Sequence, residues 1–323
     1  MHAPTTTAPP ARSLHVGLRR FAWFTLAYNV LVVLWGAVVR ATGSGAGCGA
    51  HWPLCNGVVI PQAPQFHTIV EFTHRLMSGA TLLLVFALLL WTWRATTKGA
   101  LARWAAGASM LLTLNEALLG ALLVLLRLVA HNQSAARGVY LGFHFANTLL
   151  LLAALALTAE FLTTPASRAS MQLRRGSLRI VLPGLLATLL TGITGSLAAL
   201  GDTLYPATSL AAAMQQDFSA ASSLLLRLRW LHPACAILAG IFLLWLLAQT
   251  LSSSAPRAQR SLAVAVLALL VVQYILGTAN VLLLAPLWIQ ITHLLLADLL
   301  WIALVLLATR FCLKQRSITQ ETS

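Results

Sequence analysis

Long apolar runs separated by short polar connections organise this chain from end to end. Each run holds about 20 residues with few charges, the length that an α-helix needs to cross a hydrocarbon core of about 30 Å. The pattern predicts an all-α integral membrane protein with eight transmembrane helices. The expected spans are 20–40, 69–92, 104–126, 137–160, 179–200, 224–250, 261–285 and 287–309.

Composition supports this interpretation, because 59% of the 323 residues are hydrophobic and 9% are charged, against about 25% charged in a soluble domain. The net charge of +14 suggests nucleic acid at first sight. However, lysine and arginine concentrate in the N-terminal tail, after the second, fourth and sixth helices, and at the C-terminal end. The positive-inside rule then places both termini in the cytoplasm and argues against a nucleic-acid partner. We expect a multi-pass protein of the bacterial inner membrane with a retained first helix, a mitochondrial location being the alternative.

Two of the four cysteines, Cys48 and Cys55, lie in the first connection on the outer side. An outer compartment is oxidising and permits disulfides. The residues between them are able to form a turn, so we expect a disulfide, with two free thiols as the alternative. Cys235 and Cys312 lie in or near helices and are interpreted as packing residues.

Four histidines stand inside the apolar runs, each about one or two turns after the start of the second, fourth, sixth or eighth helix. They are His74, His144, His232 and His293. Polar side chains inside a bilayer are functional candidates by default, although one such histidine alone is more simply a packed core residue. Four at similar depth near the outer face indicate paired axial heme ligands, with zinc the less favoured metal.

The two halves of the chain resemble each other. The strings NEALLGALLVLL and VQYILGTANVLLL match, and several pairs recur at a nearly constant offset: Gly36 with Gly192, Glu116 with Gln273, Gly120 with Gly277, and His74 with His232. This predicts two tandem four-helix bundles with pseudo-twofold symmetry along the membrane normal and one bis-histidine heme in each. The expected segments are a tail 1–18, a first half 19–160, a cytoplasmic linker 161–178, a second half 179–310 and a tail 311–323.

Arginines on the outer side cluster around the histidines. Arg75 follows His74 directly, and Arg229 lies three residues before His232. Because guanidinium groups bind carboxylates with two parallel hydrogen bonds, these arginines are candidates for heme propionate contacts. The alternative is that they extend from the helix ends toward the membrane surface.

Glu71 lies one turn before His74 on the same helix face. The matching place in the second half has no acid, so we expect protons or substrate to be handled in the first half. The alternative is a solvated glutamate at the start of the helix. Glu116 and Asp298 are interpreted as packing residues of the bundle.

The first connection and the second helix carry a specific set of motifs. WGAVVRATGSG at 35–45, Cys48, WPLCNG at 52–57 and EFTHR at 71–75 resemble the heme A synthase family. The resemblance extends over essentially the whole chain, with eight helices and four histidines in the even ones. The chain departs from many members in having no second cysteine pair in 201–223 and in having Ala50 and His51 before the tryptophan.

The resemblance implies an oxidoreductase that converts heme O to heme A for cytochrome oxidase, by oxidising the C8 methyl group to a formyl group through successive hydroxylations. It implies a catalytic Glu71, a disulfide between Cys48 and Cys55, a substrate heme site at His74 and His144, and a resident heme b on His232 and His293. The second half would relay electrons to the first.

Expected partners are heme O, a heme O synthase, cytochrome oxidase assembly factors, an electron donor and the lipid bilayer, and a homo-oligomer remains open. One competing interpretation is a di-heme cytochrome b that only carries electrons. Another is a transporter, which is disfavoured because Pro183 and Pro233 lie near helix starts, where proline is tolerated.

Overall fold

The computed structural model describes residues 11–163, 171–173, 175–220, 222–252 and 255–315. Within these residues, eight helical spans are long and apolar enough to cross a membrane, which confirms the all-α membrane fold. The elements are α1 Ala11–Ala41, η1 Ser44–Ala46, α2 Phe66–Ala95, α3 Leu101–Leu125, α4 Ala135–Thr163, β1 Met171–Leu173, α5 Arg175–Leu204, α6 Leu210–Phe218, α7 Leu224–Leu228, α8 Leu231–Ser252, α9 Arg257–Leu282, α10 Leu287–Cys312 and β2 Leu313–Gln315.

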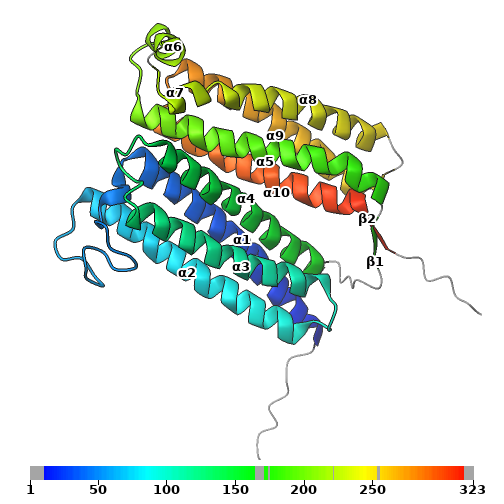
Figure 1. Ribbon diagram of the computed structural model, residues 1–323. Helices are drawn as coiled ribbons and strands as arrows, with labels where there is room; N and C mark the ends of the chain where they lie inside the picture. The colour runs from blue at the N-terminus through cyan, green and yellow to red at the C-terminus, as the bar shows by residue number, and fades with distance from the viewer. Residues whose placement is uncertain (1–10, 164–170, 174, 221, 253–254, 316–323) are drawn as a thin grey trace, which may run out of the picture.

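The long helices form two groups that pack side by side, α1–α4 in one and α5 with α8–α10 in the other (Figure 1). Helices α1 and α4 contact α5 and α10 across the junction. Among the spans, α4 and α10 are the most buried, and Trp301 on α10 donates from Nε1 to the carbonyl oxygen of Leu149 on α4 at 2.6 Å. The two groups therefore share one apolar core along this junction.

The sixth expected helix is interrupted. It consists of α7 and α8, separated by a turn at Arg229 and Trp230. Pro233 explains the break, because proline lacks the N–H that would bond the carbonyl of Arg229 in a continuous helix, yet is tolerated in the first turn of α8. The connection before it contains the further helix α6, whose N-cap Ser209 accepts a hydrogen bond from the backbone N–H of Ala212 at 3.1 Å.

The two ends of the molecule differ. The first loop, 42–65, lies at the same end as α6, whereas the start of α1 and the β1–β2 pair lie at the other end (Figure 1). Strand β1 pairs antiparallel with β2, so part of the expected linker 161–178 is a strand, and α5 begins at Arg175 within it. Helix α1 begins inside the expected tail, at Ala11. Residues 1–10, 164–170, 174 and 316–323 of the tails and linker lie outside the described residues.

Candidate functional site

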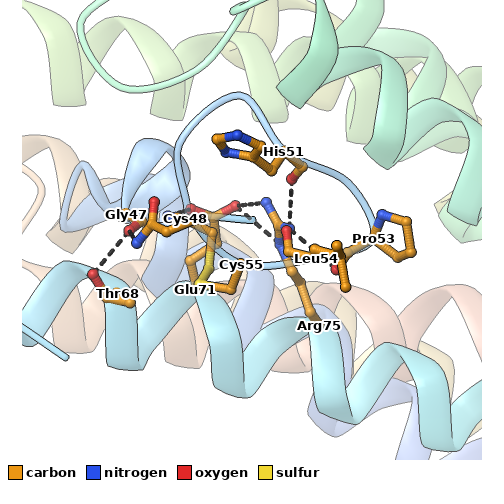
Figure 2. Close-up of a disulfide and its surroundings, with 10 residues drawn as sticks. Gly47, Cys48, His51, Pro53, Leu54, Cys55, Thr68, Glu71 and Arg75 are labelled. Atoms are coloured by element: carbon orange, nitrogen blue, oxygen red, sulfur yellow. Dashed lines mark hydrogen bonds and ion pairs between the residues drawn. A yellow bond between two sulfur atoms is a disulfide. The ribbon is translucent and has the colours of Figure 1, made fainter. Parts of the chain in front are cut away.

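The first loop folds back over the start of α2 and is closed by a disulfide (Figure 2). Cys48 and Cys55 form this disulfide and are both buried, as the sequence predicted. Gly47 lies so close to α2 that a Cβ there would stand 2.3 Å from the carbonyl oxygen of His67. Since that carbonyl belongs to the backbone, only glycine permits this approach. The loop is thereby pressed against the helix that carries the first candidate histidine.

Glu71 is the residue on which the loop and α2 converge. Its side chain is buried, and its Oε2 accepts the backbone N–H of Cys48 at 2.8 Å. Its Oε1 accepts from Nη2 of Arg75 at 2.5 Å, while Nη1 of Arg75 donates to the carbonyl oxygens of His51 and Leu54 at 2.7 and 2.6 Å (Figure 2). The alternative of a solvated glutamate is therefore wrong. Arg75 ties the carboxylate to the loop, and its contact with a heme propionate stays a prediction.

Each candidate histidine faces a glycine on the transmembrane helix before it. A Cβ at these glycines would come within 2.9–3.8 Å of the nearest ring atom, and the closer values are tighter than ordinary van der Waals contact. Glycine thus leaves room on one side of every ring. The pairs are Gly36 on α1 with His74 on α2, Gly120 on α3 with His144 on α4, Gly195 on α5 with His232 on α8, and Gly277 on α9 with His293 on α10.

One of these glycines differs from the sequence-based match. Gly36 was matched with Gly192, but Gly195, about one helical turn later, is the residue that faces a histidine. A Cβ at Gly192 would instead meet Leu149 and Phe145 of α4. The sequence match chose the wrong one of two nearby glycines, because Gly192 and Gly195 lie at offsets of 156 and 159 from Gly36, on either side of the 157 and 158 of the other pairs.

The second-half histidines lie close to each other. The ring centroids of His232 and His293 are 6.4 Å apart, with an angle of 84° between the ring planes. Two imidazoles that share one iron through bonds of about 2 Å hold their centroids about 6 Å apart. Nδ1 of His232 bonds the carbonyl oxygen of Thr191 at 3.0 Å, which leaves Nε2 for a metal. This pair therefore fits a shared heme iron in spacing.

The first-half histidines have a different environment. His74 lies on α2 and His144 on α4, both in the first group of helices. The Nδ1 atoms of both are buried and make no hydrogen bond within the described part of the chain. Oε1 of Glu116 lies 3.4 Å from Nδ1 of His144, so the interpretation of Glu116 as a packing residue missed its position beside a candidate ligand.

Acids also stand near the second-half site, which the sequence-based asymmetry did not anticipate. Nε of Arg229 lies 3.3 Å from Oδ1 of Asp202, and Nη1 of Arg229 lies 3.4 Å from Oδ1 of Asp217. Its Nη2 donates to the carbonyl oxygens of Gly201 and Tyr205 at 2.6 and 2.8 Å. Burial raises the pKa of Asp217, and the Arg229 guanidinium opposes that shift. Periodicity within one helix could not reveal these acids, because they come from α5 and α6.

Asp298 is a further acid of the apolar spans. It is fully buried on α10, and neither carboxylate oxygen has a hydrogen-bond partner among the described residues. Among the described residues, Asp298 makes no hydrogen bond to any of the four histidines. The interpretation of Asp298 as a packing residue stays a prediction.

Comparison with known proteins finds several relatives that are similar in sequence. The chain is 46% identical over 297 residues to a protoheme IX farnesyltransferase of Thermus thermophilus, covering 90% of this chain and 48% of that protein. It is 42% identical over 108 residues to a heme A synthase of Shouchella clausii, which covers 33% of this chain and 36% of that protein. A heme A synthase of Alkalihalophilus pseudofirmus is 37% identical over 144 residues, 45% of this chain and 46% of that protein.

The chain spans about half the length of the Thermus relatives. The COX15-CtaA family, described as cytochrome oxidase assembly protein, matches residues 19–305. This match extends from α1 into α10 and takes in the disulfide loop, Glu71 and all four histidine–glycine pairs. The chain therefore belongs to the COX15-CtaA family of cytochrome oxidase assembly proteins, in agreement with the resemblance of its motifs to heme A synthases.

Proposed function

We propose that this chain is a heme A synthase, an oxidoreductase that converts the C8 methyl group of heme O to the formyl group of heme A. Family membership and the heme A synthase relatives support this proposal. The observation that carries it is the pairing of every candidate histidine with a glycine on the preceding helix. Four such pairs in the two helix groups suit one planar cofactor for each group better than four isolated structural histidines.

The first half, 19–160, binds heme O as substrate through His74 and His144. The iron of a heme bound there would supply the oxidising chemistry, because a methyl group has no acidic proton to abstract. The protein orients the ring and excludes water, and the apolar helices or the surrounding lipid accommodate the farnesyl tail. Glu71 is the catalytic acid or base of this site, since a buried carboxylate held by Arg75 and the Cys48 amide is fixed in position for proton transfer.

The second half, 179–310, holds heme b on His232 and His293 and relays electrons to the first half. The ring spacing of 6.4 Å supports this assignment. Arg229, three residues before His232, contributes to binding of the heme propionates, for which it would have to exchange contacts that it makes with Asp202 and Asp217. The two halves are related by a pseudo-twofold axis along the membrane normal, which the repeated glycine–histidine geometry favours.

Both termini lie in the cytoplasm of a bacterial cell, with the disulfide loop on the oxidising side of the inner membrane. The distribution of lysine and arginine supports this orientation. A single cysteine introduced at Ser219, beyond the end of α6, should react with a membrane-impermeant maleimide in intact cells. A cysteine introduced at Thr97, between α2 and α3, should react only after the cells are opened.

The Thermus relatives suggest a partner. They are named protoheme IX farnesyltransferases, and they are about twice as long as the matching region. We infer that the unmatched half carries the farnesyl transfer and that this chain receives heme O from such an enzyme. Cytochrome oxidase assembly factors would take up the heme A, and an electron donor completes the cycle.

Analysis of extracted hemes after co-expression with a heme O synthase tests the function. Chromatography should show heme b together with heme O and heme A. Heme b alone would favour the di-heme electron carrier, and the absence of heme would favour the transporter. Either result would overturn the proposal.

A further inference from the structure

Glu116 on α3 is held by side chains of α4. Its Oε1 accepts a hydrogen bond from Oγ1 of Thr148 at 2.5 Å, and its Oε2 accepts one from Nδ2 of Asn147. Asn147 is buried and also donates to the carbonyl oxygen of Leu112 at 2.9 Å. Both oxygens of Glu116 are therefore acceptors, which suits a carboxylate held in one orientation.

The ring of His144 lies beside this carboxylate. Its Nδ1 is buried without a hydrogen bond among the described residues, and Oε1 of Glu116 lies 3.4 Å away. Gly120, one turn after Glu116 on α3, leaves room on another side of the same ring, where a Cβ would come to 3.8 Å. A small rotation of the imidazole would bring Nδ1–H into hydrogen-bond range of Glu116.

No equivalent carboxylate faces the other rings in the described residues. Nδ1 of His232 bonds the backbone carbonyl of Thr191. Beside His293, the residue that matches Glu116 is Gln273, and its Nε2 donates to the backbone carbonyl oxygen of His293 at 2.9 Å. The structure thus places a carboxylate beside the ring of His144 and a neutral carbonyl on the ring of His232, while Nδ1 of His293 has no hydrogen-bond partner among the described residues.

We propose that Glu116 is a positioning residue that orients His144 and lowers the reduction potential of a heme bound in the first half. A carboxylate that accepts the Nδ1–H of a ligating histidine fixes the ring, leaves Nε2 for the iron and makes the ligand more basic. A more basic axial ligand stabilises the oxidised iron. The electron therefore moves less readily onto this heme than onto a heme held by neutral partners. This inference rests on the proposed function.

Redox titration of the full chain, purified with heme in both halves after co-expression with a heme O synthase, tests the proposal. In Glu116→Gln the equilibrium constant for reducing the first-half heme should rise at least tenfold, which is about 59 mV for one electron. The second-half heme of the same sample is the internal control, and its potential should not change. A merely structural role would alter heme content or thermal stability and leave the potential where it is.

Thr148→Val provides a second, milder variant. It keeps the charge of Glu116 and removes the hydrogen bond that competes for Oε1, so the first-half potential should fall. An unchanged potential in Glu116→Gln would overturn the inference. If Glu116→Gln does not retain the first-half heme, Thr148→Val decides: a fall supports the inference, and a rise or no change overturns it. Wild-type protein without heme in the first half would instead contradict the proposed function.

Discussion

A glycine beside an imidazole leaves space that every other residue would fill with a side chain. Helix interiors disfavour glycine by about 1 kcal/mol relative to alanine, so its recurrence opposite all four histidines has a cost that packing or binding must offset. Room for the edge of a planar ligand is the explanation that serves all four positions. The cost of adding one methyl group should then follow the distance from each Cβ to its ring.

Alanine substitutions at these glycines should lower heme content in a graded order. Gly195→Ala places Cβ 2.9 Å from His232 and should reduce second-half heme by about tenfold, because a clash of 1–3 kcal/mol falls on a ligand. Gly120→Ala, at 3.8 Å, should be tolerated. Gly79→Ala is the matched control, since nothing lies within 4 Å. Heme-to-protein ratios measure the series, and an equal loss in all three variants would contradict the explanation.

Replacement of Glu71 by glutamine tests whether its carboxylate takes part in the chemistry. The amide keeps the size of the side chain but removes the charge that Arg75 binds. Heme A output should fall by about 100-fold, within the range of a positioned acid or base, while heme b content stays unchanged.

Glu160→Gln is the control for that experiment, because Glu160 is also buried and pairs with Arg310 at 2.8 Å. It lies near the end of α4 that is opposite the disulfide loop, so heme A output should stay within about twofold of wild type. Full output from Glu71→Gln would remove Glu71 from the chemistry.

At the scale of elements, the sequence predicted the membrane-spanning helices, because the length of an apolar run determines them. A run long enough to cross a membrane needs no partner to be recognised, and all eight spans could be placed in this way. The break between α7 and α8 depends on Pro233 together with the carbonyls that bind Arg229, which belong to α5 and the residue after it. Likewise, the pairing of β1 with β2 joins distant segments. Contacts between distant segments leave no periodic signal in either one.

The candidate site likewise contains residues that the sequence predicted and residues that it did not. The histidines, Glu71 and the cysteine pair could be identified because each stands out against its own apolar or outer segment. The glycine partners, and the proximity of Glu116 to His144, required the packing of two helices. Gly195 was missed for a related reason, since two glycines three residues apart are nearly equivalent in sequence and face different neighbours in space.

Removal of the disulfide tests the role of the first loop. Cys48→Ser with Cys55→Ser should cost about 2–3 kcal/mol, the chain-entropy value for a short closed loop. Because Glu71 accepts the N–H of Cys48, heme A output should fall with it, while second-half heme b stays bound. Thermal unfolding and heme analysis measure the two effects. Cys235→Ser is the control, since Cys235 lies outside the disulfide, and equal output in both variants would separate the loop from catalysis.

At the scale of the whole molecule, one arginine joins the two helix groups at the end where the candidate sites lie. Arg40 on α1 donates to the carbonyl oxygen of Ala199 at 2.6 Å and to Oγ1 of Thr203 at 2.5 Å, both on α5. Its Nη2 donates to Oε1 of Gln290 on α10 at 2.9 Å. Asp202 attracts it electrostatically and also pairs with Arg229. A continuous set of charges thus runs from the first group to the residue three positions before His232.

Arg40→Met should loosen this junction without disturbing either group. The loss of charged hydrogen bonds should destabilise the protein by about 2–4 kcal/mol, and release of Asp202 should alter the absorption spectrum of the second-half heme. Arg103→Met is the control, because Arg103 bonds Trp93 and Thr96 within the first group. Thermal unfolding and heme spectra of both variants decide the matter. A spectral change in Arg103→Met as large as in Arg40→Met would show that any lost arginine suffices, whereas a change confined to Arg40→Met would mean that the junction transmits charge between the halves.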